Sequence, residues 1–424
     1  MKKRLLSMLI ASVLLLSLAA CSNQAGSGAQ ETGAEESTEN TAKDADVSAM
    51  SFDEMKEAAK GTEVTFYGWG GDEDLNKWLD DVFAPQMKEK YDITMNRVPM
   101  DIDQVLSQLA GEVQAEEEDG SIDMIWINGE NFQSAKENGF LYGPFTEALP
   151  NFNDYVDAES EDVTMDFAYP IEGYEAPYGK AQFVLFHDSA VTPEAPKSAE
   201  ELLEYCKTYK GKVTYPALPD FTGSAFVRNL IYEICGYEQF MDMEADKETV
   251  KEAIEPALAY MRSLNPYLWN EGKAFPDSST TLDKMFADGE VVFNMSYAPY
   301  GVATGIANGT YTATTQSFQF EKGTLGNTNF MAVSKNSGNK AGALVAINEM
   351  ISPEMQASRY EVLRTLPVVE YEKLDDAQKE AFDSVEIGEG VIPQDELLSK
   401  RLPEMPAELV PIIEEIWQEE VVGK

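Results

Sequence analysis

The feature that most constrains the fold is an alternation of short apolar runs with helical patterns. Residues 64–67 are predicted to form a strand, and the apolar residues of 75–83 recur at helical spacing. A strand at 93–98 and a helix at 105–113 repeat that order, and the continuous apolar run 122–127 is typical of a buried parallel strand. Strands that alternate with helices predict an α/β fold with a parallel sheet, whose ligands bind at the carboxyl ends of the strands.

The alternation continues in the second half of the chain without a short-period internal repeat. It predicts strands at 181–186, 212–215, 291–295 and 330–334, and helices at 199–209 and 226–234. Beyond residue 341 the pattern is nearly all helical and is punctuated by prolines. A chain of 424 residues is too long for one ordinary domain. It suits two domains of about 150 residues each.

The first residues have the pattern of an export signal. Three basic residues precede a short apolar run that ends in Leu18-Ala19-Ala20-Cys21. Small residues before a cysteine resemble a bacterial lipobox, so we predict a lipoprotein signal peptide at 1–20 and lipidation of Cys21. The alternative is an ordinary secretory cleavage site with an incidental Cys21. Residues 22–46 contain no apolar residue larger than alanine, so we expect 21–50 to be the lipidated cysteine and a flexible tether.

The charge of the chain excludes some partners. With 75 acidic and 32 basic residues, the formal net charge is −43, which repels nucleic acids and anionic lipid headgroups. We therefore expect membrane attachment through the lipid alone, on the extracellular face of the cell membrane or on its periplasmic side. Cys206 and Cys235 leave two alternatives open, a disulfide or two free thiols. A single histidine, His187, predicts no metal site built from several histidines.

Four stretches resemble a known family. They are Gly68-Trp69-Gly70-Gly71 and the segments 123–132, 173–182 and 215–221. These stretches resemble the type II periplasmic solute-binding proteins and, within them, the YnjB branch, which is related to thiamine, polyamine and iron binders. The resemblance implies two α/β lobes joined by crossing strands, with a ligand cleft between them. By that analogy lobe one comprises 61–181 with 320–365, and lobe two comprises 182–319 with 366–424.

The resemblance also implies a function. We expect the extracellular substrate-binding component of an ABC importer, a monomer without cofactor or catalysis, whose partners are a small-molecule ligand and the permease and ATPase subunits. The alternative is a lipid-anchored secreted hydrolase that acts on glycans through paired carboxylates. With 75 acidic residues, pairs arise by chance, and neither a Gly-x-Ser-x-Gly nor a His-Glu-x-x-His motif is present.

Candidate ligand contacts lie in segments near predicted strand ends or helix starts. They are Tyr67, Trp69, Gly70, Trp126, Asn128, Glu130, Tyr178, Lys180, Asp220, Ser224, Tyr297, Asn327 and Asn329. Each has a plainer alternative: Asn128 and Ser224 are also typical helix caps, Lys180 is also a typical surface ion pair, and Trp126 and Tyr297 are also typical core residues.

The chemistry of these candidates suggests the ligand. Aromatic faces attract a cation by roughly 0.5–2 kcal/mol each, and Glu130 or Asp220 would add to that attraction. The helix start at 222–224 and Lys180 suit an anion instead. A molecule that carries both charges would reconcile the two, so we expect a thiamine-like ligand, another small organic cation, or its phosphate.

Overall fold

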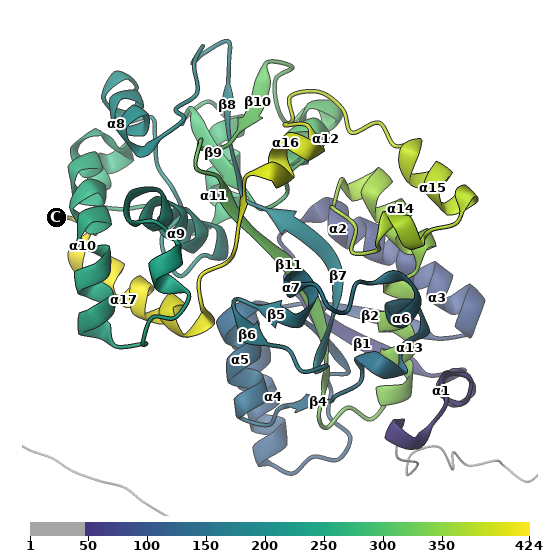
Figure 1. Ribbon diagram of the computed structural model, residues 1–424. Helices are drawn as coiled ribbons and strands as arrows, with labels where there is room; N and C mark the ends of the chain where they lie inside the picture. The colour runs from purple at the N-terminus through teal and green to yellow at the C-terminus, as the bar shows by residue number, and fades with distance from the viewer. Residues whose placement is uncertain (1–46) are drawn as a thin grey trace, which may run out of the picture. The chain divides into compact units, whose positions relative to one another are not determined.

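The computed structural model describes residues 47–424, so the predicted signal peptide and Cys21 lie outside the described residues. A seven-stranded sheet, the large sheet, runs in the order β12-β11-β3-β1-β2, and β4 and β7 also pair with β11 (Figure 1). Its strands are β1 (Glu63–Gly68), β2 (Thr94–Pro99), β3 (Met124–Ile127), β4 (Leu141–Tyr142), β7 (Glu175–Gln182), β11 (Thr324–Ser334) and β12 (Arg401–Leu402).

The large sheet is mixed rather than parallel. Strand β1 pairs in parallel with β2 and β3, as the alternation of strands and helices predicts. Strand β11 runs antiparallel to β3, β4 and β7. The expectation of a parallel sheet is therefore wrong for this part, because β11 is not preceded by a helix that returns the chain across the same sheet.

Helices cover both faces of the large sheet. One face packs against α1 (Phe52–Ala59), α2 (Glu73–Trp78), α3 (Ala84–Tyr91), α6 (Pro150–Tyr155), α13 (Lys340–Met350) and α14 (Pro353–Leu363), and the other against α4 (Ile102–Gln114) and α5 (Gly129–Glu137). In β3, Met124 belongs to the first core and Ile125 to the second. A strand that is buried on both faces explains the continuous apolar run of the sequence.

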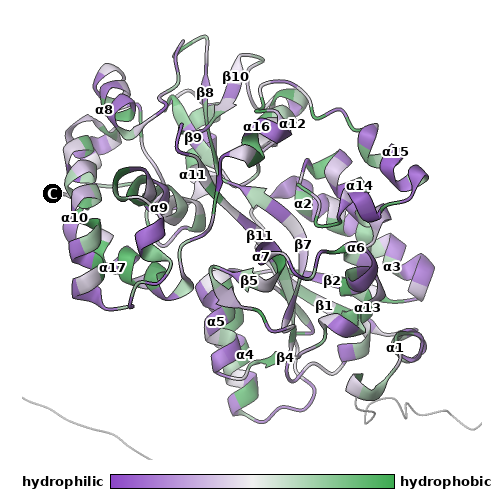
Figure 2. Cartoon of the chain, viewed as in Figure 1, coloured by the Kyte–Doolittle hydropathy of each residue, from purple (hydrophilic) through white to green (hydrophobic). Residues whose placement is uncertain are grey.

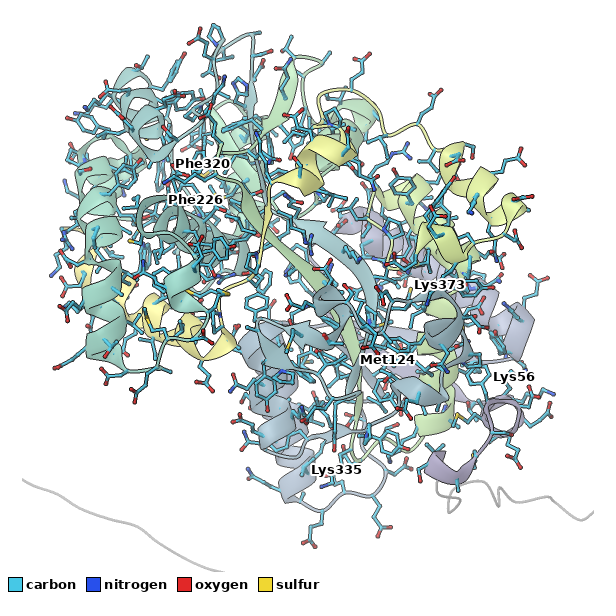
Figure 3. The ribbon with its side chains drawn as sticks, in the orientation of Figure 1. Lys56, Met124, Phe226, Phe320, Lys335 and Lys373 are labelled. Atoms are coloured by element: carbon cyan, nitrogen blue, oxygen red, sulfur yellow. The ribbon has the colours of Figure 1, made fainter. Side chains whose placement is uncertain are left out.

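The second half of the fold is built on a small antiparallel sheet in the order β10-β8-β9. Its strands are β8 (Val184–Asp188), β9 (Phe293–Ser296) and β10 (Thr315–Phe318). The helices that share its core are α8 (Ala199–Thr208), α9 (Phe221–Cys235), α10 (Lys247–Leu264), α11 (Ser279–Ala287) and α17 (Val410–Glu420). Figure 3 places Phe226 and Phe320 in this half and Met124 in the other, in agreement with their separate cores.

Two predicted strands differ in the structure. The predicted strand 181–186 is divided between β7 and β8 at Phe183, whose backbone N–H donates to the carbonyl of Leu325 at 2.7 Å as the chain passes from one sheet to the other. The predicted strand 212–215 is wrong. The carbonyl of Lys212 accepts from Val292 and that of Val213 from Trp269, each at 2.8 Å. Because these bonds go to two different segments, no ladder forms.

Beyond residue 341 the chain is mainly helical, as expected, with α15 (Asp376–Asp383) and α16 (Gln394–Ser399) in addition to the helices above. Helix α12 (Gly301–Asn308) lies before that region. Figure 2 shows α17 largely green and α15 largely purple. Helix α17 buries Ile413 and Trp417 in the core of the small sheet. Helix α15 packs through Phe382 against Tyr360 of α14, with ring centroids 6.1 Å apart, although the sequence analysis placed residues 366–424 in lobe two.

A short hairpin and the first described residues complete the fold. Helix α7 (Glu161–Thr164) leads into β5 (Met165–Asp166) and β6 (Tyr169–Pro170). Residues 47–49 form a short 3-10 helix, and Val47 belongs to the core of the large sheet, so the expected tether 21–50 is wrong from Val47 onward. No helix in residues 47–424 is long and apolar enough to cross a membrane.

Candidate functional site

An aromatic hollow lies beside the carboxyl end of β1. We define it by Trp69, Trp126 and Tyr178, which line it together with Phe66, Leu75, Leu79 and Arg97. Trp69 is 44% exposed, whereas Tyr178 is buried. The rings of Trp126 and Tyr178 meet edge to face at 5.8 Å. A side chain at Gly68 would lie at an ordinary contact distance, 3.4 Å, from the Cβ of Trp126, so the end of β1 lies next to this tryptophan.

Asn128 fixes the position of Trp126. The indole Nε1–H of Trp126 donates to Oδ1 of Asn128 at 2.8 Å, and Nδ2 of Asn128 donates to the carbonyl of Thr328 at 2.6 Å. The side chain of Asn128 makes no capping hydrogen bond to α5, so the helix-cap alternative does not describe it. Asn128 instead links the end of β3 to β11 and holds the wall of the aromatic hollow.

Tyr67 and Gly70 lie outside the aromatic hollow. Tyr67 is buried in the core between the large sheet and helices α4 and α5. Gly70 approaches Pro99 so closely that a side chain would lie 2.4 Å from the Cβ of Pro99, and its carbonyl accepts from Asn76 at 2.7 Å. The structure therefore gives both residues a packing role near the hollow.

A second group of candidates surrounds Arg228 of α9. The guanidinium is 1% exposed. Its Nη1 donates to Oγ of Ser224 at 2.7 Å, and its Nη2 lies 3.3 Å from both the hydroxyl of Tyr297 and Oε2 of Glu404. The Tyr297 hydroxyl donates to the other oxygen of Glu404. A buried, hydrogen-bonded ion pair thus joins α9 to the segment that follows β12.

Three more carboxyl groups act electrostatically on this ion pair or on one another. They belong to Glu130 of α5, Asp166 of the hairpin and Glu414 of α17. We call Glu130, Asp166, Glu404, Glu414 and Arg228 the acid cluster. It contains four carboxyl groups and one guanidinium.

Burial governs the protonation of the acid cluster. Burial raises the pKa of Glu130 to about 7, although Arg228 opposes that rise. Burial also raises the pKa of Asp166 well above its ordinary value, and the backbone N–H of Gly129 counteracts part of the effect. Burial raises the pKa of Glu414 as well, while a hydrogen bond with Ser224 lowers it. Carboxyl groups with raised pKa values in one place are a frequent property of functional sites.

The β5–β6 hairpin carries Asp166 to the start of α5. The backbone N–H of Gly129 donates to Asp166, so this carboxyl caps the helix. Gly129 has a φ of +60°, and a side chain there would lie 3.1 Å from the ring of Phe167. Phe167 itself contacts the ring of Phe221 at 6.0 Å and the guanidinium of Arg228 at 5.2 Å. The hairpin therefore links the helices of the large sheet to α9.

The remaining candidate ligand contacts belong neither to the aromatic hollow nor to the acid cluster. Asp220 caps α9 by accepting from the backbone of Gly223 and also accepts from Ser279, both at 2.8 Å. Nζ of Lys180 lies 3.6 Å from Asp162 and 3.9 Å from Glu370. On β11, both side-chain polar atoms of Asn327 are buried without a hydrogen-bond partner in residues 47–424, and Asn329 faces Gly179 across the ladder.

Sequence reasoning missed Asp166, Phe167, Phe221, Arg228, Glu404 and Glu414. One signal could have found Arg228, which is a charged residue in a mainly apolar predicted helix. No pattern marks the others, because they come from a short hairpin and from segments far apart in the chain. Cys206 and Cys235 are free thiols in the structure, so the disulfide alternative is not observed. Among residues 47–424, no group of three or more histidine, cysteine or acidic side chains is arranged to hold a metal ion.

Known proteins resemble this chain in sequence and structure. A family described as bacterial extracellular solute-binding protein matches residues 83–382. Protein YnjB of Escherichia coli (strain K12) is 35% identical over 373 residues, which cover 87% of this chain and 93% of that protein. A Clostridium perfringens ABC transporter structure has a TM-score of 0.57 at 19% identity and covers 84% of this chain and 98% of that chain.

The binding protein AfuA of Actinobacillus pleuropneumoniae has a TM-score of 0.59 at 12% identity, covering 86% of this chain and 99% of that chain. These structural matches confirm the two-lobed fold of type II periplasmic binding proteins. The chain therefore belongs to the bacterial extracellular solute-binding proteins.

Proposed function

We propose that this substrate-binding protein captures a small organic cation, of which thiamine is one example, and delivers it to the permease. The observation that supports the proposal is the charge of the acid cluster, with four carboxyl groups and one guanidinium. That guanidinium is already bound to Glu404, Ser224 and Tyr297. Once ionised, the other carboxyl groups would attract a second cation, and none of them would attract an anion.

The phosphate form of such a ligand has less support. The start of α9 already holds a carboxylate, because Asp220 accepts from the backbone N–H of Gly223 at 2.8 Å. Lys180 lies within 4 Å of Asp162 and Glu370, at 3.6 and 3.9 Å. Both features that suited an anion are thus neutralised within the protein, so we propose the cation rather than its phosphate.

We propose that an uncharged ring of the ligand lies against Trp69 and Trp126 in the aromatic hollow. Trp126 connects the two regions, since it hydrogen-bonds Asn128 at the residue directly before α5 and Glu130 is the second residue of that helix. A molecule with a flat ring and a separate positive charge would use both. Offset stacking on an aromatic side chain contributes about 0.5–1.5 kcal/mol beyond the area that it buries.

The fold itself does not identify the ligand. The AfuA structure contains fructose-6-phosphate, an anion, at 12% identity. A structure described as the Atu4243–GABA receptor has a TM-score of 0.56 at 14% identity. The same architecture therefore accommodates different charges, and the proposal depends on the side chains of this chain. The alternative of a glycan hydrolase receives no support from the comparisons.

Thermal melts with a charge-matched panel test the proposal. Thiamine, choline and putrescine serve as cations, thiamine monophosphate as the mixed-charge form, and glucose 6-phosphate as the anion. We expect at least one cation to raise the melting temperature, because a ligand present at about 100 times its Kd stabilises the folded state by about 2.7 kcal/mol. Stabilisation by the anion but by none of the cations would contradict the proposal.

We also propose that Cys21 carries a lipid and holds a monomeric protein on the outer face of the membrane. The support is the sequence Leu18-Ala19-Ala20-Cys21 after a short apolar run. A Cys21→Ala variant is expected to leave the membrane fraction after cell fractionation. Membrane retention equal to that of the parent protein would contradict the lipid anchor.

Closure of the proposed lobes, 61–181 with 320–365 and 182–319 with 366–424, is a further part of the proposal. Ligand binding between two lobes brings them together, so X-ray scattering should give a smaller radius of gyration once a stabilising cation has been added. An unchanged radius at saturating ligand would contradict the closure.

A further inference from the structure

The four carboxyl groups of the acid cluster differ in how the protein holds them. Asp166 accepts from the backbone N–H of Gly129. Glu404 accepts from the hydroxyl of Tyr297 and pairs with Arg228 at 3.3 Å. Glu414 has a hydrogen bond with Ser224. Each of these three carboxyl groups already has a role that fixes part of the fold.

Glu130 is held more loosely than the other three. Its Oε1 accepts from Nδ2 of the neighbouring Asn131 at 3.0 Å. Its Oε2 is buried and has no hydrogen-bond partner in the part of the chain that the structure describes. The same holds for Oδ1 of Asp166, a residue that is 2% exposed, so two unpartnered buried oxygens belong to one cluster. A buried oxygen without a partner is unfavourable, and a bound cation would supply the missing partner.

We infer that Glu130 is the carboxyl that pairs with the positive group of the ligand, and that it releases its proton to the solvent when the ligand binds. The inference rests on the proposed cationic ligand. The exchange is balanced in charge: a neutral carboxylic acid and a cation become a carboxylate–cation pair, and one proton passes to the buffer.

Charged and titratable groups face Glu130 from several elements. They are Asp166 of the β5–β6 hairpin, Arg228 of α9, Glu404 after β12 and Glu414 of α17. Burial raises the pKa of Glu130 to about 7; Arg228 opposes this, while Glu414 and Glu404 add to it. Near pH 7 the free protein is therefore a mixture of both protonation states of this carboxyl group.

Ligand binding should shift that mixture. A cation in contact with a carboxylate lowers its pKa by about 1–3 units, so binding at pH 7 should release up to about half a proton. The affinity should rise with pH, by about tenfold in all for each pKa unit of that shift, and level off above about pH 8, because the ionised form of Glu130 pairs with the cation.

Calorimetry of the full chain at pH 7 measures the released protons. The titrant is whichever of thiamine, choline and putrescine binds most tightly, and the titration is repeated in phosphate and in Tris, which differ in ionisation enthalpy. For the wild-type protein we expect up to about half a proton released per ligand. Glu130→Gln should release none and bind at least about tenfold more weakly. Glu137→Gln, an exposed position on the same helix, should match the wild type in both.

The outcomes separate the inference from the proposed function. A cation that binds without proton release, or that binds Glu130→Gln as tightly as the wild type, overturns the role of Glu130 and leaves the cationic ligand standing. Failure of all three cations to bind overturns the proposed function and this inference with it.

A second measurement covers the case in which Glu130→Gln does not fold. Carbon-13 NMR of the wild-type protein should show the Glu130 carboxyl titrating near pH 7 without ligand and at lower pH with it. An ordinary midpoint near its usual pKa of 4.5 in the free protein overturns the inference.

Discussion

The aromatic hollow and the acid cluster differ in which of their buried polar atoms lack a hydrogen-bond partner. In the hollow, the indole N–H of Trp126 has its acceptor, Asn128, and the ring of Tyr178 packs at 4.5 Å against the guanidinium of Arg359. In the acid cluster, one oxygen each of Glu130 and Asp166 and Nε of Arg228 are buried without partners in residues 47–424. Nε of Arg359 beside the hollow is also buried without a partner in those residues, so the two regions differ in the unpartnered acceptor oxygens of the acid cluster.

This difference separates two kinds of recognition. Because Arg359 already occupies one face of the Tyr178 ring, a ligand cation gains less from that ring than from an unoccupied aromatic face. The hollow is therefore better suited to the uncharged part of a ligand. The acid cluster has the charge and the unpartnered oxygens that a cation requires. The affinity for the ligand should depend on both regions. The preference for a positively charged ligand should depend on the acid cluster alone.

Removal of the guanidinium should produce the largest effect and tests the acid cluster as a folded unit. Arg228→Met leaves Glu404 buried at 5% exposure with only the hydroxyl of Tyr297 as partner. Breaking a buried ion pair by removing one partner costs about 3–5 kcal/mol, so the free energy of unfolding in urea should fall by that amount.

The double variant Arg228→Met/Glu404→Gln is the matched control. It removes the unpaired charge as well, so it should recover a large part of the lost stability. A loss below about 1 kcal/mol in the single variant, or no recovery in the double variant, would show that the two charges do not depend on each other as described.

Two tryptophans distinguish binding from folding in the aromatic hollow. Trp69→Ala should weaken ligand binding by about 2 kcal/mol, as loss of an aromatic anchor does, with a smaller effect on stability because the side chain is 44% exposed. Trp78→Ala is the control. Trp78 is 1% exposed and stacks on Phe83, so its loss should cost about 3–5 kcal/mol of stability. Calorimetry and thermal melts that gave the two variants the same profile would remove the hollow from the site.

The next prediction concerns Glu175, a buried carboxyl that interacts with Asp166 of the acid cluster, and the pH dependence of stability that it causes. Burial raises the pKa of Glu175 well above its ordinary value, and Asp166 adds to the rise. A raised folded pKa means that stability is greatest below the unfolded pKa, about 4.5, and falls as the pH increases toward the folded value. Each pKa unit corresponds to about 1.4 kcal/mol. Glu175→Gln should therefore be more stable than the wild type at pH 8 and similar to it at pH 4.

The pKa of Glu172 is shifted in the opposite direction to that of Glu175. It is exposed, and its hydrogen bond to Lys136 lowers its pKa, so its contribution is present above the unfolded pKa and is lost as the pH falls. Glu172→Gln should lose a little stability at pH 8 and none at low pH. Urea unfolding at the two pH values measures both variants, and equal pH dependence in all three proteins would contradict the assigned state of Glu175.

The smallest effect is expected at Lys180. Its nearest carboxylate oxygens, on Asp162 and Glu370, lie 3.6 and 3.9 Å away and belong to side chains that are 39% and 40% exposed. Such ion pairs contribute about 0–1 kcal/mol, so Lys180→Ala should change both stability and cation affinity by less than about 1 kcal/mol. A tenfold or larger loss of affinity in calorimetry would place Lys180 in the site.

The sequence predicted those parts of the fold that depend on local pattern. The run 122–127 could be recognised because a strand buried on both faces has no polar alternation. The segment 212–215, Lys-Val-Thr-Tyr, also has residues typical of a strand but gives its backbone hydrogen bonds to two different neighbours, which no local pattern records. The direction of β11 was also unpredictable from local residues, because it is set by the passage of the chain between two sheets.

The candidate site could be predicted only where it depends on local sequence pattern. Trp69 follows a predicted strand and Trp126 lies near the end of another, and the structure brings both to one hollow. Tyr67 is only two residues from Trp69, yet it is buried in a separate core. The partners of Arg228 include Glu404, which is 176 residues away in the chain. Contacts of such long range come from tertiary packing and leave no trace in residue spacing.

The most direct test of the proposed cationic ligand is the charge of the molecule that the protein retains when it is purified from cells. Protein purified without dialysis is denatured, and the released small molecules are identified by mass spectrometry in both ion modes. We expect one molecule of a small organic cation to be released per protein molecule. Stoichiometric release of an organic phosphate, a carboxylate or a neutral sugar would contradict it.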